Sequence, residues 1–233
     1  MKKLIATLGI TLSMISAASF ADDNLEKKYN HVDLVMIIDK SGSMHGMESD
    51  TIGGFNSMLD KQRKLDIKTE VTTVMFNSNP DVIHTRRPLD EVKNLTPGDY
   101  LPNGSTALLD SVGMTIDKVS DYYAVNDSKN KVIVAIITDG LENSSREYSK
   151  QNVRNLIEKK KESGWEFVFL GANIDAVSEA GSLGISSDRV VQYKATNEGV
   201  RKNFDAVSAF AAEAISSDAV SNEWKNRAEQ DRK

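Results

Sequence analysis

The chain has 233 residues, of which 39% are hydrophobic and 27% are charged, a composition typical of a soluble globular domain with one well-buried core. The formal net charge of −5 at pH 7 argues against nucleic acid as the main partner, because phosphate binding needs a clustered basic face. The absence of cysteine excludes both disulfides and a cysteine-linked lipid.

Residues 1–21 indicate a secretory signal peptide. Lys2 and Lys3 precede an apolar stretch, and small residues lead up to Ala21. The apolar stretch is short for a membrane span and is interrupted by hydroxyl residues, so we expect cleavage, with no membrane insertion afterwards, rather than an uncleaved anchor. The short basic, apolar and small-residue pattern is typical of a bacterial leader. We therefore expect the mature protein in the periplasm or outside the cell.

Strand and helix patterns alternate over residues 31–216, behind a flexible lead-in at 22–30 and ahead of a polar tail at 217–233. Short β-branched or apolar runs predict strands, and apolar residues at helical spacing predict helices. We expect strands at residues 32–39, 69–77, 81–87, 131–139, 165–171 and 189–194, and helices at 50–64, 108–119, 149–163, 174–183 and 196–216. The tail is polar apart from Trp224, and we expect it to fray.

This order predicts a doubly wound α/β domain. The turn at residues 77–80 is short enough to allow only a hairpin, so the third strand should run antiparallel to the second. The remaining strands are separated by helices, which favours a mostly parallel six-stranded, Rossmann-like sheet with one antiparallel edge strand and helices on both faces. In such sheets ligands bind beyond the carboxyl ends of the strands, where the winding direction switches.

Oxygen-bearing side chains stand at the expected strand ends. Asp39 ends the first strand, and Ser41 and Ser43 follow at alternate positions. Asp139 ends the fourth strand, and Thr106 opens a predicted helix. Carboxylates and hydroxyls suit a hard cation that takes oxygen ligands. The alternative is that the hydroxyls are turn and cap residues and the acids are ordinary strand-end groups.

The pattern Asp39-x-Ser41-x-Ser43, followed by Thr106 and Asp139-Gly140, resembles the metal-ion-dependent adhesion site of von Willebrand factor A domains. The resemblance extends from about residue 31 to about residue 214. Within that family the chain is similar to a bacterial, single-domain secreted type. It implies that Ser41, Ser43 and Thr106 bind the cation through hydroxyls, while the two acids act mostly through waters or hydroxyl contacts. It also implies Mg2+, with Mn2+ or Ca2+ as alternatives, and a protein partner whose acidic side chain completes the coordination.

Charged residues in the two loops expected to frame the cation are candidates for contacts with the partner. They are Lys40, His45, Glu142 and Arg146. Lys40 is best explained as a surface lysine. The alternative is that it lines the rim and helps to recruit an anionic partner. The sequence leaves open which of the others sets specificity.

A binding module rather than an enzyme is favoured, because no nucleophile or general base stands out. The chain has no Gly-x-Ser-x-Gly motif, and Ser41 stands where an aspartyl-phosphate phosphatase would carry a second acid. Two alternatives stay open. One is a metal-dependent hydrolase of anionic substrates, and the other is a structural module whose ion only orders loops.

Overall fold

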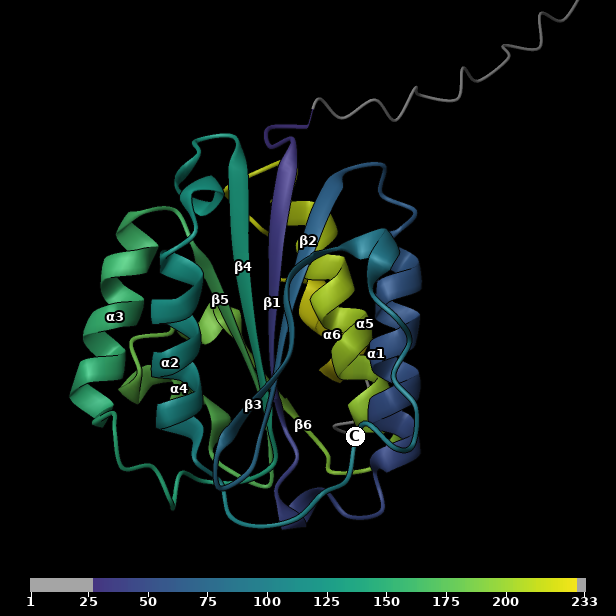
Figure 1. The fold of residues 1–233 in the computed structure, drawn as a ribbon, viewed down its shortest axis with the longest axis vertical. Coiled ribbons are helices and arrows are strands. Elements are labelled where there is room, and N and C mark those ends of the chain that lie inside the picture. The colour runs from purple at the N-terminus through teal and green to yellow at the C-terminus, as the bar shows by residue number, and fades with distance from the viewer. Residues whose placement is uncertain (1–26, 230–233) are drawn as a thin grey trace, which may run out of the picture.

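The computed structural model describes residues 27–229, which form a six-stranded sheet between two layers of helices (Figure 1). The expected signal peptide lies outside the described residues. One layer consists of α1, α5 and α6, and the other of α2, α3 and α4. Among the described residues, no helix has the length and apolar character needed to cross a membrane.

The elements alternate along the chain as the sequence predicts. The strands are β1 (His31–Asp39), β2 (Lys68–Phe76), β3 (Pro80–Pro88), β4 (Asn130–Thr138), β5 (Glu166–Ala172) and β6 (Val190–Tyr193). The α-helices are α1 (Glu48–Gln62), α2 (Leu108–Ser120), α3 (Lys150–Glu162), α4 (Ala176–Ser182), α5 (Asn197–Ala214) and α6 (Glu223–Glu229). Short 3-10 helices are η1 (Gly42–Met44), η2 (Leu89–Glu91), η3 (Tyr123–Asn126) and η4 (Ser187–Arg189).

The sheet has the order β3-β2-β1-β4-β5-β6, and only the edge strand β3 is antiparallel to its neighbour. The predicted fold class is therefore confirmed. The chain winds outward from β1 to β3 and then returns to place β4 on the other side of β1. The carboxyl ends of β1 and β4 consequently flank the switch in winding direction, where open α/β sheets bind ligands.

The central strand β1 is buried along its whole length because both of its faces are covered by helices. Leu34, Met36 and Ile38 point into the core under α1, α5 and α6. Val35 and Ile37 point into the core under α2, α3 and α4. This alternation explains why the strand is a continuous apolar run in the sequence rather than an alternating one.

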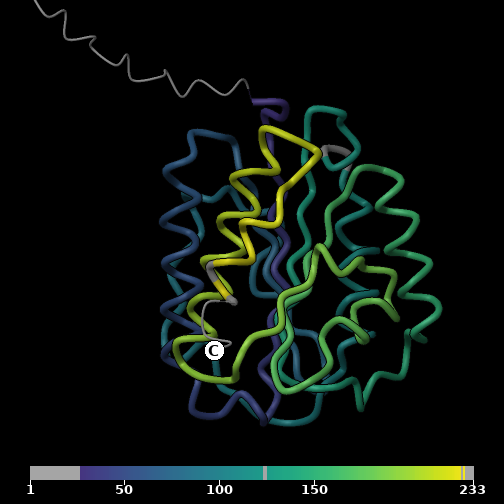
Figure 2. Tube along the Cα trace, turned by 180° about the vertical axis from the view of Figure 1, so that it is seen from behind, coloured from purple at the N-terminus to yellow at the C-terminus, as the bar shows by residue number. Residues whose placement is uncertain are grey.

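The prediction that the tail frays is wrong over the residues of α6. Trp224 in α6 is only 2% exposed, and its ring packs edge-on against Phe210 of α5 with 5.1 Å between centroids. In Figure 2, which views the molecule from behind, the yellow C-terminal segment turns back after α5 and packs against that helix. The folded unit therefore extends beyond the expected boundary at Ser216, because the Trp224 side chain is buried in the core although the residues around it in the sequence are polar.

The last residues of the expected flexible lead-in are held by the domain. The Tyr29 backbone N–H donates to the Ile215 carbonyl at 3.1 Å, and the Asn30 N–H donates to the Lys129 carbonyl at 3.1 Å. The Tyr29 hydroxyl also donates to the Asp218 carboxylate. The chain thus enters β1 from a fixed position at the amino end of the sheet.

Candidate metal centre

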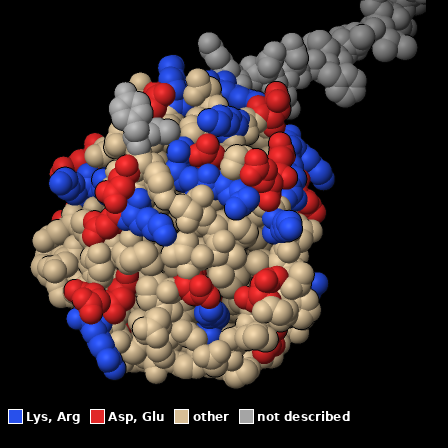
Figure 3. All heavy atoms as spheres, in the orientation of Figure 1, with Lys and Arg blue, Asp and Glu red and all other residues tan. Residues whose placement is uncertain are grey.

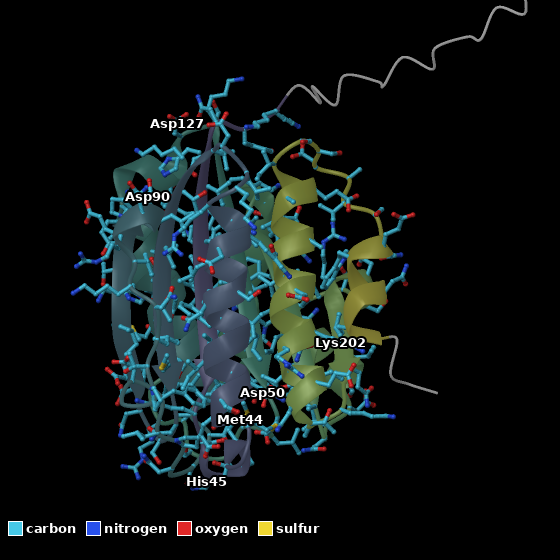
Figure 4. The ribbon with its side chains drawn as sticks, turned by 90° about the vertical axis from the view of Figure 1, so that its right-hand side faces the viewer. Met44, His45, Asp50, Asp90, Asp127 and Lys202 are labelled. Carbon is cyan, nitrogen blue, oxygen red and sulfur yellow. The ribbon has the colours of Figure 1, made fainter. Side chains whose placement is uncertain are left out.

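The candidate residues come together where the carboxyl ends of the parallel strands meet, an end of the molecule that we call the carboxyl-end pole. Figure 4 shows Met44 and His45 at this pole and Asp127 at the opposite one. Three loops build it: residues 40–47 after β1, which ends at Asp39, residues 101–107 before α2, and residues 139–149 after β4. Each loop carries at least one of the predicted ligands.

Asp39 is fully buried and fixed by three neighbours. Its Oδ1 accepts from the Ser41 N–H at 2.6 Å, and its Oδ2 accepts from the Thr138 hydroxyl at 2.6 Å. Its carbonyl accepts from the buried Tyr100 hydroxyl at 2.5 Å. Burial raises the pKa of Asp39, although the hydrogen bonds from Thr138 and Ser41 oppose that rise.

A chain of hydroxyls connects the β1 loop with β4. Ser41 Oγ lies 3.0 Å from Ser43 Oγ, and the Ser43 hydroxyl donates to Asp139 Oδ1 at 2.5 Å. Burial raises the pKa of Asp139 despite this hydrogen bond. Because the Ser41 backbone N–H donates to Asp39, the acids at the ends of β1 and β4 are joined through Ser41 and Ser43.

The fifth residue, Thr106, reaches the same place. A β-carbon on Gly140 would lie 3.2 Å from Thr106 Oγ1 and 3.7 Å from Ser43 Oγ, so both hydroxyls border one small space. Asn143 holds the backbone of Thr106 with two hydrogen bonds, one through its side chain and one through its own backbone. The Thr106 N–H donates to Asn143 Oδ1 at 2.8 Å, and the Thr106 carbonyl accepts from the Asn143 N–H at 3.0 Å.

Asp139 Oδ2 is buried and has no hydrogen-bond partner among the described residues. Neither Asp39 nor Asp139 has a Lys, Arg or His nitrogen of the described chain within 4.0 Å. Buried acceptors are almost always satisfied, and a buried carboxylate needs a compensating positive charge. The donor set, two carboxylates and three hydroxyls, is the chemistry that hard divalent cations bind.

Sequence reasoning missed three residues that shape this site: Tyr100, Thr138 and Asn143. Thr138 could have been found, since it directly precedes Asp139 at the end of a strand. Tyr100 and Asn143 carry no local signal, because each acts on a residue far away in the chain.

The predicted rim residues have different surroundings. Lys40 forms an ion pair with Asp81, with Nζ 2.8 Å from Oδ2, so its charge is partly compensated. His45 is exposed and lies 3.3 Å from a Glu48 oxygen. Arg146 is exposed, and its backbone N–H donates to Asp110 Oδ2 at 2.8 Å.

Glu142 differs from the other expected rim residues because its carboxylate is directed into the protein. It accepts from the backbone N–H groups of Leu109 at 2.8 Å, Ser144 at 2.8 Å and Ser145 at 2.7 Å. These bonds fix the β4–α3 loop against the start of α2 and satisfy an N–H at the helix terminus that has no partner within the helix.

A His/Asp/Glu group with metal-compatible spacing also exists among the described residues, but at the other end of β1. It consists of His31, Asp33 and Glu70. The eight-residue rise along β1 separates His31 from Asp39 by about 26 Å at ~3.3 Å per residue. Arg86 binds this group, with Nε 2.6 Å from Asp33 Oδ1 and a terminal nitrogen 2.5 Å from Glu70 Oε2. The guanidinium already supplies the positive charge, so this ion-paired cluster is separate from the candidate metal centre.

No protein-family model matches the chain, and no curated protein matches it. Solved structures do match. The pilus adhesin SpaC from Lactobacillus rhamnosus GG aligns with a TM-score of 0.64 and 14% identity, covering 81% of this chain and 32% of the adhesin. The von Willebrand factor domain of the type V pilus tip protein Mfa5 from Porphyromonas gingivalis aligns with a TM-score of 0.57 and 12% identity, covering 83% and 99%.

A third similar structure is that of a matrix protein of the mussel byssus, proximal thread matrix protein 1, with a zinc-occupied metal-ion-dependent adhesion site. It aligns with a TM-score of 0.55 and 16% identity, covering 80% of this chain. This chain spans 47% of the mussel protein, less than half its length. At these identities the matches establish the fold, which is the one that the motif resemblance predicted.

Proposed function

We propose that this chain, which has the von Willebrand factor A fold, is a divalent-cation-dependent protein-binding module that captures an acidic group of a partner. One observation carries the proposal. The hydroxyls of Ser41 and Ser43 connect to Asp139, and the Ser41 backbone N–H connects the same serine to Asp39. Within this set a buried oxygen of Asp139 has no partner among the described residues. Buried acceptors are nearly always satisfied by protein, water or an ion, and here all the surrounding ligand donors are oxygen atoms that suit a cation.

Each residue has a separate part in holding the cation. Ser41, Ser43 and Thr106 would bind it directly through neutral hydroxyls. Asp39 and Asp139 would orient the two serines and supply negative charge without contacting the ion directly. Because hydroxyls carry no formal charge, a bound divalent ion would keep enough positive charge to attract a carboxylate from outside. Asp39 is itself prevented from turning by Thr138 and the Ser41 N–H.

Mg2+ is the ion that we propose, since the donors are all oxygen atoms and few of them are charged. Mn2+ and Ca2+ are the alternatives for a competition titration. The zinc-occupied site of the mussel byssus protein supports metal binding by a domain of this fold.

We further propose that the mature protein acts in the periplasm or outside a bacterial cell. The leader pattern at residues 1–21 supports this location, as do the pilus and byssus origins of the similar structures. A role in adhesion or scaffolding is consistent with those surroundings, and we propose no catalysis at this site.

The test is a calorimetric Mg2+ titration of the wild type and of a Ser41→Ala, Ser43→Ala double variant. We expect the double variant to fold and to lose Mg2+ binding. Ser105→Ala is the matched control, because Ser105 is exposed and adjacent to Thr106 but outside the predicted ligand set. Unchanged Mg2+ affinity in the double variant would rule the assignment out.

A second measurement separates binding from catalysis. A panel of phosphoesters is incubated with the protein and Mg2+ or Mn2+, and we expect no turnover. Turnover that Asp139→Ala abolishes would instead favour a metal-dependent hydrolase.

A further inference from the structure

The large hydrophobic side chains that are exposed among the described residues all lie at the carboxyl-end pole. They are Leu101, Leu141 and Val177, which are 61%, 56% and 47% exposed. Leu101 lies in the loop that leads to Thr106, and Leu141 follows Asp139 by two residues. Val177 is the second residue of α4, which begins shortly after β5 ends. Exposed apolar side chains scattered over a surface are ordinary, but a group gathered around a candidate ligand site indicates an interaction surface.

Backbone hydrogen bonds connect both leucine loops to the candidate metal centre. The Leu101 carbonyl accepts from the Asn103 side chain at 3.0 Å, and the Asn103 N–H donates to the Lys40 carbonyl at 2.9 Å. Leu141 lies between Asp139 and Asn143, whose N–H donates to the Thr106 carbonyl. The two leucines are therefore presented on fixed loops, which lowers the entropy cost of binding against them.

Several charged side chains near this pole are engaged by the protein itself. Glu142 and Asp110 each accept from three backbone N–H groups, and Lys40 is paired with Asp81. Figure 3 shows that charged side chains crowd the upper part of the molecule on this face and become sparse toward the carboxyl-end pole. Depletion of charge with exposed apolar groups is what the centre of a protein–protein interface looks like.

A groove beside Thr106 adds room for more than one residue of a partner. It has a volume of about 600 Å3, and Pro80, Met114 and Tyr148 contribute to its lining. Ser105, the neighbour of Thr106, also lines it. A segment that placed a carboxylate at the cation could therefore continue along the surface.

We propose that the carboxyl-end pole docks a protein segment in which a carboxylate is flanked by apolar side chains. The carboxylate goes to the cation, and the apolar neighbours pack on Leu101 and Leu141. This inference rests on the proposed function and specifies the chemistry of the partner. A free acidic metabolite would not need the leucines, and a lipid surface would not need the cation.

The probe is a random peptide library displayed on phage, selected on the full-length protein loaded with Mg2+ and released with EDTA. We expect the released peptides to share an Asp or Glu with a Leu, Ile, Phe or Met within about two positions. A synthetic copy of a selected peptide should bind Leu101→Ser and Leu141→Ser about five- to tenfold more weakly, the effect of losing part of a buried leucine contact. Leu141→Met is the matched control, since it keeps an apolar side chain and should retain the affinity.

The outcomes separate this inference from the proposed function. Peptides with an acid but no apolar neighbour, or serine variants that bind like the wild type, would overturn the inference and leave cation-dependent capture of an acid standing. Peptides that are apolar without an acid and bind in the presence of EDTA would overturn it too, as would a library with no EDTA-released peptide. The proposed function itself fails on a different measurement, the absence of Mg2+ binding by the unliganded protein.

Discussion

Replacing Trp224 with alanine tests whether α6 is part of the folded domain. The side chain is 2% exposed, and a tryptophan buries about 150–250 Å2, which at ~25 cal/mol per Å2 amounts to about 4–6 kcal/mol as an upper bound. Its indole N–H has no hydrogen-bond partner among the described residues, and a buried unpaired donor costs about 1–3 kcal/mol. Subtracting the middle of this range, about 2 kcal/mol, from about 4–6 kcal/mol leaves an expected net loss of about 2–4 kcal/mol for Trp224→Ala.

Urea denaturation measures this loss, and a drop in melting temperature of roughly 4–16 °C should accompany it, at about 2–4 °C per kcal/mol for a domain of this size. Trp224→Phe is the control. It keeps an aromatic ring against Phe210 and removes the unpaired N–H, so it should cost less than about 1.5 kcal/mol. Trp224→Ala within about 0.5 kcal/mol of the wild type would show that α6 does not contribute to the core in solution.

Three further predictions concern other parts of the protein. Gly54→Ala should lower stability by about 1–3 kcal/mol, because its β-carbon would lie 2.5 Å from an aromatic ring of α5. Gly53→Ala, whose β-carbon would have no atom within 4 Å, should raise stability by about 0.5–1 kcal/mol. Equal effects of the two variants on the melting temperature would contradict the packing of α1 on α5. Mg2+ at about 100 times its dissociation constant should stabilise the protein by about 2.7 kcal/mol, an increase in melting temperature that EDTA should reverse. Hydrogen bonds from Lys28 and Tyr29 hold the pKa of Asp218 at about 2; the stability that this depressed pKa provides is present above the ordinary value of 3.8 and is lost as the pH falls toward 2. The melting-temperature difference between the wild type and Asp218→Asn should accordingly narrow between pH 5 and pH 2, and a constant difference would show that Asp218 acts through something other than its charge.

The sheet could be predicted closely because its signal is local. Every strand differs from its expected bounds by no more than one residue at either end. Continuous apolar runs such as β4 require burial on both faces, and the short turn before β3 permits only a hairpin. The order of the strands does not follow from this pattern alone, since local runs do not say which strands are neighbours.

The candidate ligands could be predicted because strand ends in a doubly wound sheet converge at one known edge. Their supports could not, since the contacts are tertiary. Tyr100 reaches the Asp39 carbonyl from a loop 61 positions later in the chain. Glu142 was placed on the rim because its loop was expected there, but a carboxylate is as readily engaged by backbone N–H groups as by solvent. The fraying prediction failed for a similar reason, since the polar residues around Trp224 say nothing of the pocket that receives it.

The contrast between two acids on β1 gives the strongest physical reason to expect a cation at the carboxyl-end pole. Asp33 and Asp39 belong to the same strand and are both buried, at 1% and 0% exposed. Asp33 is compensated by the guanidinium of Arg86, which donates to both carboxylate oxygens at 2.6 and 3.1 Å. Asp39 receives only neutral donors, and Asp139 beside it keeps an oxygen without a partner in the described chain. Two buried carboxylates without a protein cation need either protons or a positive charge from outside. Three hydroxyls gathered around them provide neutral ligands for a divalent ion, whereas a site designed only to keep two acids protonated would have no need of them.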